Sequence, residues 1–120
     1  GQHGSTFGGN PLATAAGNAV IGEIERADLI GNAARRGEEL RAILRSYDSP
    51  LIGDVRGAGL LIGVGLTDGE AHRLSDAALA EGLIINAPNE SSIRLAPPLI
   101  VGDAELAEFR EKFGRALDAL

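Results

Sequence analysis

The apolar and polar residues fall into segments that predict helices and strands in the order α-α-β-β-α-β-β-α. The first helix is expected from about Pro11 to Arg26, with Asn10 as its N-cap and proline at the first helical position, where a missing N–H is no loss. Its apolar side chains cover most of the circumference instead of one stripe. A helix with this pattern is expected to be buried on several sides.

A second helix is predicted after a cap at Asp28, running to about Tyr47. It is amphipathic, because Leu40, Ile43 and Leu44 share one face and charged side chains occupy the others. Two short strands are expected next, from Leu51 to Val55 and from Leu60 to Leu66, on either side of the turn Arg56-Gly57-Ala58-Gly59.

A third helix is predicted from Ala71 to Glu81, and Gly82 ends it because glycine accepts the left-handed conformation that follows many helices. The apolar run Leu83-Ile84-Ile85 predicts a short strand. Another strand is expected from Ser92 to Leu95, ended by a double proline that cannot donate ladder hydrogen bonds.

The last helix is predicted to begin with Asp103 as its cap. Its apolar side consists of Leu106, Phe109, Phe113, Leu117 and Leu120. Short strands joined by short loops among helices predict an α+β fold with an antiparallel or mixed sheet covered by helices.

Composition excludes several classes of function. The formal net charge of −6 leaves no basic excess for a nucleic-acid backbone, and three phenylalanines and one tyrosine offer few rings for stacking on bases. The apolar runs are far shorter than the roughly 20 residues of a membrane-spanning helix. The absence of cysteine fits a reducing compartment, so a cytoplasmic location is expected.

The sequence begins at Gly1 and contains no methionine. The first residues have neither the basic nor the apolar segment of a signal peptide. We therefore expect the chain to be a piece of a longer protein.

The segment before the first helix combines features that suit an anion. It has three glycines, at positions 4, 8 and 9, which allow close backbone approach, and the hydroxyls of Ser5 and Thr6 can donate hydrogen bonds. The adjoining helix N-terminus adds positive potential, so a phosphate group is a natural ligand. The alternative from spacing alone is a flexible leader that ends in an ordinary capped helix.

The run His3-Gly4-Ser5-Thr6-Phe7-Gly8-Gly9-Asn10-Pro11-Leu12-Ala13 resembles the segment that follows the catalytic lysine in class III aminotransferases. Its Ser-Thr-Phe-Gly-Gly form is most similar to the acetylornithine and ornithine branches. Two later segments, at 55–63 and 93–99, resemble the family's small-domain hairpin and its late strand with a double proline.

This resemblance implies the small C-terminal domain of a fold-type I pyridoxal-phosphate transferase, preceded by a helix that leads from the large domain. Residues 1–26 would form the cofactor-phosphate loop and connecting helix, and residues 27–120 the small α+β domain. The cofactor implied is pyridoxal 5'-phosphate, bound in a homodimer. The partners implied are small-molecule substrates, an amino acid and a 2-oxo acid, with no nucleic acid and no membrane.

The resemblance also implies roles for individual residues. Thr6 matches a threonine whose hydroxyl and backbone N–H hold the cofactor phosphate of the neighbouring subunit, and Ser5 matches a residue that contacts substrate. Arg94 matches an arginine that faces the active site, where it pairs with an acidic residue of the large domain or with a substrate carboxylate. A structural ion pair at the domain junction is an equal alternative for Arg94.

The remaining polar residues suggest less chemistry. Arg56 is expected to support the turn or a domain interface. His3 and His72 are far apart and unaccompanied, so no metal site is predicted. Lys112 is the only lysine in the sequence, and we expect it to be solvated in the last helix, opposite the phenylalanine stripe.

No catalytic residue is therefore predicted within this chain. The family's Schiff-base lysine lies upstream of the Ser-Thr-Phe motif, so the isolated chain is expected to be inactive. Within a longer enzyme, the resemblance implies reversible amino transfer between N-acetylornithine and 2-oxoglutarate, a step of arginine biosynthesis. The alternatives are the ornithine or 4-aminobutyrate branch of the family, or a non-catalytic module that self-associates.

Overall fold

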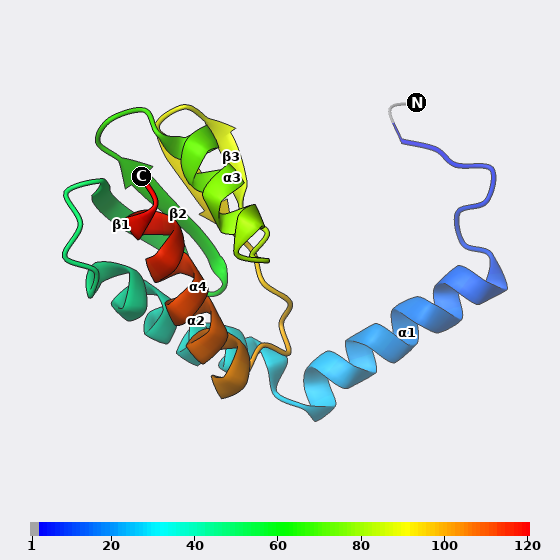
Figure 1. The fold of residues 1–120 in the computed structure, drawn as a ribbon. Coiled ribbons are helices and arrows are strands. Elements are labelled where there is room, and N and C mark those ends of the chain that lie inside the picture. Colours follow the sequence, from blue (N-terminus) through cyan, green and yellow to red (C-terminus); the bar gives the residue numbers. More distant parts are fainter. Residues whose placement is uncertain (1–2) are drawn as a thin grey trace.

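The computed structural model describes residues 3–120; residues 1 and 2, which the sequence predicts to lie in the cofactor-phosphate segment, are outside the described residues. The elements follow the predicted order (Figure 1). They are α1 (Pro11–Arg26), α2 (Leu29–Arg45), β1 (Ile52–Ala58), β2 (Leu61–Leu66), α3 (Ala71–Ala80), β3 (Asn86–Asn89), β4 (Ser92–Leu95) and α4 (Asp103–Asp118).

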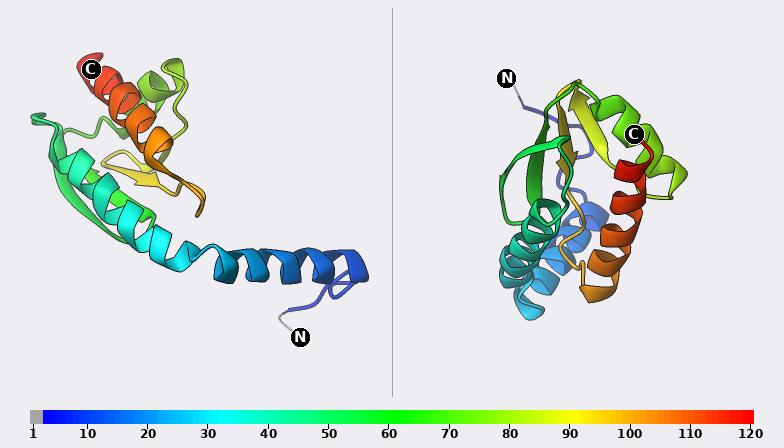
Figure 2. Two further views of the ribbon diagram at one scale, coloured as in Figure 1. Left: turned by 90° about the horizontal axis from the view of Figure 1, so that it is seen from below. Right: turned by 60° about the vertical axis from the view of Figure 1, so that its left-hand side comes forward.

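The four strands form one antiparallel sheet in the order β1-β2-β4-β3. Side chains alternate along the central strands, so Ile62 and Val64 of β2 and Ile93 of β4 point into the core, whereas Arg94 points to the open face. Helices α2, α3 and α4 back the buried face (Figure 2). This arrangement confirms the predicted α+β fold and its antiparallel sheet covered by helices.

Three of the four aromatic side chains gather where α4 packs against the rest of the core. The rings of Phe109 and Phe113 stack with centroids 5.0 Å apart, and Tyr47 lies 5.5 Å from Phe113. Phe113 is fully buried, as is Leu44 of α2. Of the apolar stripe predicted for the last helix, Leu106, Phe109 and Phe113 are buried in the core and Leu117 packs against it, as expected. Leu120 lies after the end of α4 and is exposed, so its place in the stripe was predicted wrongly.

Helix α1 extends away from the body formed by the other elements (Figure 1). Within residues 3–120 none of its side chains is buried, and Leu12 at its start is 81% exposed. The prediction of a helix buried on several sides is thus not met by contacts inside this chain. A left-handed turn at Asp28, with φ of 48°, separates α1 from α2. Among the described residues, no helix combines the length and hydropathy needed to cross a bilayer.

The hairpin turn lies later than predicted. β1 continues through Arg56 and Gly57 to Ala58, which pairs with Leu61, and the chain reverses at Gly59. Gly57 and Gly59 have φ values of 139° and 51°, conformations that favour glycine, so the two glycines allow a long strand and a tight reversal. The predicted turn over 56–59 is wrong for its first three residues.

The predicted strand Leu83-Ile84-Ile85 is also wrong, since β3 begins only at Asn86. The Leu83 N–H donates to the carbonyl of Ala78, and the carbonyl of Ile85 accepts a hydrogen bond from Ser75. These two contacts tie the apolar run to α3 instead of to a neighbouring strand.

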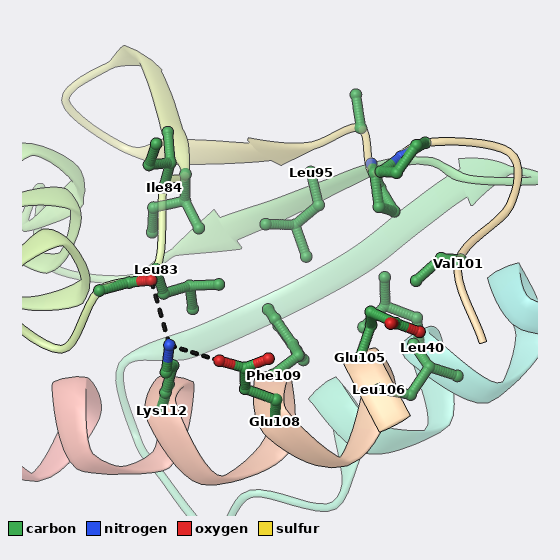
Figure 3. Close-up of a pocket in the computed structure, with 15 residues that line it drawn as sticks. Leu40, Leu83, Ile84, Leu95, Val101, Glu105, Leu106, Glu108, Phe109 and Lys112 are labelled. Atoms are coloured by element: carbon green, nitrogen blue, oxygen red, sulfur yellow. Dashed lines mark hydrogen bonds and ion pairs between the residues drawn. The ribbon is translucent and has the colours of Figure 1, made fainter. Parts of the chain in front are cut away.

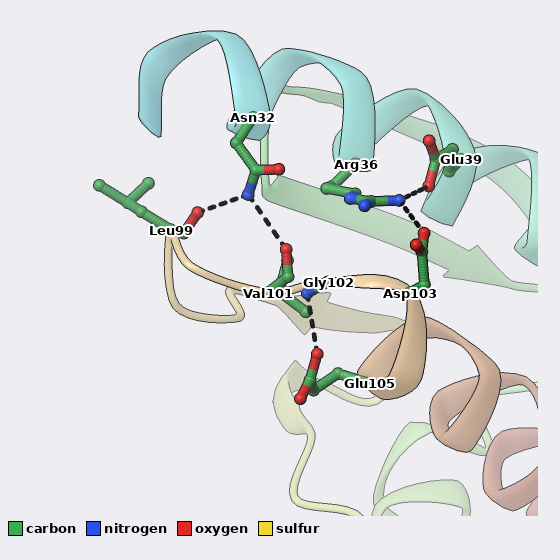
Figure 4. A network of polar contacts seen from close by, with 8 residues as sticks. All are labelled: Asn32, Arg36, Glu39, Leu99, Val101, Gly102, Asp103 and Glu105. Atoms are coloured by element: carbon green, nitrogen blue, oxygen red, sulfur yellow. Dashed lines mark hydrogen bonds and ion pairs between the residues drawn. The ribbon is translucent and has the colours of Figure 1, made fainter. Parts of the chain in front are cut away.

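The predicted cap at Asp103 is wrong by one residue, because Gly102 is the N-cap of α4. Glu105 accepts a hydrogen bond from the Gly102 N–H at 2.9 Å, and Asp103 pairs with Arg36 of α2 (Figure 4). The side-chain amide of Asn32 donates to the carbonyls of Leu99 and Val101 at 2.7 and 3.0 Å (Figure 4). Helix α2 therefore holds both the loop after β4 and the start of α4.

Helix α2 approaches the hairpin turn closely at Gly37. A Cβ on Gly37 would overlap the carbonyl oxygen of Gly59, so only glycine fits at this point of the helix. The same carbonyl accepts a hydrogen bond from Arg41, whose side chain is 8% exposed and also pairs with Glu38. The hydrogen bond from Arg41 keeps the pKa of the Glu38 carboxyl below its usual range.

Replacing Gly37 with alanine should lower the free energy of unfolding by about 1–3 kcal/mol, because the new methyl group cannot fit without moving the turn. Chemical denaturation of the 120-residue chain measures this change. Gly114→Ala in α4 is the matched control, since its Cβ would meet only the Tyr47 ring at 3.4 Å. The control should be neutral or stabilising, because alanine favours a helix over glycine. Equal effects at both positions would contradict the close-packing argument.

Tyr47 provides a test of the packing between α2 and α4. Its hydroxyl donates to the carbonyl of Arg110 at 2.7 Å, and burial raises the pKa of Tyr47 to about 12. The folded state thus favours the neutral phenol, so stability should be constant below about pH 10 and should fall as the pH rises toward 12. Because the sequence has one tyrosine, tyrosinate absorbance reports its ionisation directly. In the Tyr47→Phe variant this component of the pH dependence should disappear.

Candidate functional site

The segment His3–Asn10 is held in shape by local hydrogen bonds. The Ser5 hydroxyl accepts from the Gly8 N–H at 3.1 Å. The Asn10 side chain donates to the Phe7 carbonyl at 2.7 Å and accepts from the first turn of α1, as predicted for its N-cap. Gly9 adopts a φ of 76°, which glycine reaches without strain. The loop is therefore a hydrogen-bonded turn at the N-terminal end of helix α1.

Thr6 lies at the exposed part of this loop. Within residues 3–120, neither its hydroxyl nor its backbone N–H has a hydrogen-bond partner. Ser5, in contrast, already uses its oxygen as an acceptor, although its O–H proton stays free to donate. Two unused donors beside a helix N-terminus fit a phosphate group that approaches from outside the chain.

Arg94 lies on β4, on the open face of the sheet. The neighbouring residues Ile93 and Leu95 point into the core, so alternation directs the guanidinium outward. Among the described residues, the Arg94 guanidinium has no hydrogen-bond or ion-pair partner. Neither of its predicted roles, the ion pair at a domain junction or the contact with a substrate carboxylate, is met by a partner in this chain.

The structure does not bring the predicted site residues together. The loop that carries Ser5 and Thr6 and the sheet that carries Arg94 lie at opposite ends of the molecule, with α1 between them (Figure 1). The longest dimension of the chain is 50 Å. A site that used both ends would need groups from elsewhere.

Arg56 differs from the prediction of a turn-supporting residue. It lies inside β1 and pairs with Asp54 on the same strand. Its side chain lies over Gly63 of β2, where a Cβ would be 3.6 Å from the arginine Cγ and Nε. The strand register was needed to see which residues share this face.

A cavity of about 390 Å³ opens between α4, the segment 83–85 and the loop after β4 (Figure 3). Its walls are mainly apolar and include Leu95, Leu106 and Phe109. Lys112 stands at one end of it. Sequence reasoning missed this cavity, because its walls come from four separate segments.

Lys112 is also less solvated than predicted, with 24% of its side chain exposed. Its ammonium pairs with Glu108 at 2.6 Å and donates to the carbonyl of Gly82 at 3.3 Å, next to the end of α3. The hydrogen bond from Lys112 keeps the pKa of the Glu108 carboxyl below its usual range. Both contacts engage the Lys112 ammonium within the chain.

The histidines and acidic residues form no metal centre in the part of the chain that the structure describes. His3 and His72 are both exposed and lie on separate segments.

A family described as "Aminotransferase class-III" matches residues 1–117 of the chain. Among curated relatives, the acetylornithine aminotransferase of Streptomyces coelicolor is 44% identical over 109 residues, which are 91% of this chain and 27% of that protein. The acetylornithine aminotransferase of Mycobacterium leprae is 42% identical over 99% of this chain and 30% of its own length. The chain thus spans about three tenths of these relatives.

Solved structures agree with the sequence matches. An acetylornithine aminotransferase from Elizabethkingia anophelis superposes with a TM-score of 0.90 at 32% identity, over all of this chain and 33% of that one. An omega transaminase from Pseudomonas jessenii in complex with PMP superposes with a TM-score of 0.89 at 33% identity, over 98% of this chain and 29% of that one.

Proposed function

The chain belongs to the class-III aminotransferases, and from this premise we propose that it forms the C-terminal part of an enzyme resembling acetylornithine aminotransferase. The proposed reaction is amino transfer between N-acetylornithine and 2-oxoglutarate, as a step of arginine biosynthesis. The observation that carries the proposal is the loop at the start of α1, where Thr6 presents two unused donors beside a helix N-terminus.

Pyridoxal phosphate is the proposed cofactor, and when bound it supplies the electron sink that amino transfer needs. The contribution of this chain would be to hold its phosphate through the Thr6 hydroxyl and N–H. A dianionic phosphate favours such donors, because hydrogen bonds to a charged group are roughly twice as strong as neutral ones. Ser5 is proposed to contact the substrate with its free O–H proton.

A homodimer is the proposed assembly. Helix α1 carries the Thr6 loop away from the body of its own chain, and its apolar side chains, among them Val20 and Ile21, are exposed. Such a helix gains stability when another part of the full-length protein covers it. The cytoplasmic location expected from the absence of cysteine stays a prediction.

Arg94 is proposed to bind a carboxylate, either of a substrate or of an acidic residue in the large domain. Its exposed position on the open sheet face and the planar, two-pronged shape of guanidinium support this role. Lys112 is not proposed as catalytic, because its ammonium is paired with Glu108. The lysine that binds the cofactor would belong to the remainder of the full-length enzyme.

The exact amine donor is open between branches of the family. The ornithine and 4-aminobutyrate branches are alternatives, and the omega transaminases superpose as well as the acetylornithine enzyme does.

The domain division into residues 1–26 and 27–120 is likewise proposed, supported by the separation of α1 from the body. A second candidate is that the chain is a non-catalytic module that self-associates. Measurements of cofactor retention distinguish this candidate from part of an enzyme.

In a full-length enzyme that contains this chain, Thr6→Val should weaken retention of pyridoxal phosphate by about tenfold or more, because it removes a donor to a charged group while keeping the shape. Cofactor loss during dialysis, followed by absorbance, measures the effect. Thr14→Val is the matched control, since the Thr14 hydroxyl bonds only to carbonyls at the start of α1. Thr6→Ser should restore most of the retention. Unchanged retention in Thr6→Val would contradict the assigned role.

The 120-residue chain alone should neither turn over amino donors nor form an adduct at Lys112 with stoichiometric pyridoxal phosphate. Borohydride reduction followed by peptide mass spectrometry detects any such adduct. Lys112→Arg removes the only lysine and keeps the charge, so adducts seen in both proteins belong to the terminal amine. A Lys112-specific adduct accompanied by turnover would defeat the proposal that the catalytic lysine lies elsewhere.

A further inference from the structure

Two residues, Ala27 and Asp28, join α1 to α2 at the point where α1 leaves the body (Figure 2). Helical hydrogen bonding reaches this point in α1, where the Ala27 N–H donates to the carbonyl of Glu23 at 3.0 Å. It resumes at Asn32, whose N–H donates to the carbonyl of Asp28 at 2.9 Å. Between the two helices Asp28 adopts the left-handed conformation, with φ of 48° and ψ of 47°. Because no side chain of α1 is buried within residues 3–120, packing contributes little to its direction, and the backbone at Asp28 decides it.

The sequence offers no other residue that would end α1 here. The segment 23–30 contains neither glycine nor proline, and Asp28 stands between Ala27 and Leu29, which are good helix formers. Aspartate is one of the few residues with a side chain that visit the left-handed region, because its short carboxylate can form local hydrogen bonds. A residue without that option would favour the right-handed region, and α1 would then continue into α2. The bend between the helices therefore depends on the Asp28 side chain.

The Asp28 carboxylate has two partners in α2. One oxygen accepts a hydrogen bond from the Gly31 N–H at 3.3 Å and so caps the first turn of the helix. The other pairs with Arg35 at 3.3 Å, but both side chains are exposed, so this ion pair contributes less than the cap. Gly31 makes room for the carboxylate, since a Cβ at that position would overlap it. The cap and the bend thus require the aspartate and the glycine together.

We infer that Asp28 is a positioning residue for the Thr6 loop. By capping α2 from the left-handed conformation, it holds the bend between the helices and fixes the direction in which α1 carries the loop. Because α1 is 16 residues long, a change of about 20° in the bend moves the far end of the helix by about 8 Å. The inference rests on the proposed function only in giving the loop a phosphate to hold.

The test measures distances between pairs of spin labels by pulsed electron paramagnetic resonance in the 120-residue chain, which has no cysteine of its own. One pair joins Ala15→Cys on α1 to Ala107→Cys on α4, both at exposed positions. A reference pair joins His72→Cys on α3 to Ala107→Cys and reports on the body alone. Excess unlabelled chain removes distances between molecules. No cofactor is present, so this measurement does not depend on the phosphate role of Thr6.

Asp28→Ala should shift the mean distance from α1 to the body by about 5 Å or more, because it removes both the cap and the tolerance for the left-handed conformation. Asp28→Asn should keep the parent distance, because asparagine tolerates that conformation and its side-chain oxygen can cap the helix. Gly31→Ala should shift the distance as Asp28→Ala does, since the new methyl group displaces the carboxylate. Asp76→Ala, at an exposed position of α3, is the matched control for charge and should leave both distances unchanged.

An unchanged distance in Asp28→Ala overturns the inference, and so does Asp28→Asn if it behaves like Asp28→Ala. A shift in the reference pair also overturns it, because the effect would then lie in the packing of the body. The Asp28 side chain is 71% exposed, so its variants leave the core intact.

Cofactor retention in a full-length enzyme that contains this chain separates the inference from the proposed function. Asp28→Ala should release pyridoxal phosphate faster than the parent, and Asp28→Asn should not. A shifted distance with unchanged retention would count against the phosphate role of Thr6 and would leave the bend at Asp28 supported.

Discussion

The contact between Gly37 and the carbonyl of Gly59 sets the distance between helix α2 and the hairpin, and the rest of the body follows from that distance. Arg41, one turn further on, ties the same carbonyl to the helix. On a neighbouring face, Asn32 and Arg36 hold the loop after β4 and the first residue of α4. Helix α2 thus contacts the hairpin turn, the loop after β4 and the start of α4, because residues four apart, such as Gly37 and Arg41 or Asn32 and Arg36, lie on a common face.

The elements that depend on local chemistry could be predicted from the sequence. Asn10 and Asp28 cap helices, and Gly82 follows α3 with a φ of 75°. The errors arose where tertiary contacts decide. The run Leu83-Ile84-Ile85 has the composition of a strand, yet its hydrogen bonds go to α3. Lys112 was expected in solvent, but the end of α3 lies close enough to accept a hydrogen bond from it.

The candidate site shows the same division. The motif around Thr6 could be identified residue by residue, because its chemistry lies in one continuous segment. The alignment of Arg56, Gly63 and Arg94 across β1, β2 and β4 could not be predicted, since it depends on the register of three strands. The all-round apolar pattern of α1 describes a surface that the described chain leaves uncovered, so burial of this helix stays a prediction for the proposed assembly.

Helix α1 fixes both the distance and the rotation of the Thr6 loop relative to the body. Its 16 residues span about 24 Å at 1.5 Å per residue, and its length alone separates the Thr6 loop from the body. Because a helix turns by about 100° per residue, one inserted or deleted residue would swing the loop to a different side of the axis as well as shift it. The spacing between the motif and the small domain is therefore constrained in angle as well as in length, so drift in sequence length is better tolerated in the loops of the body than in this helix.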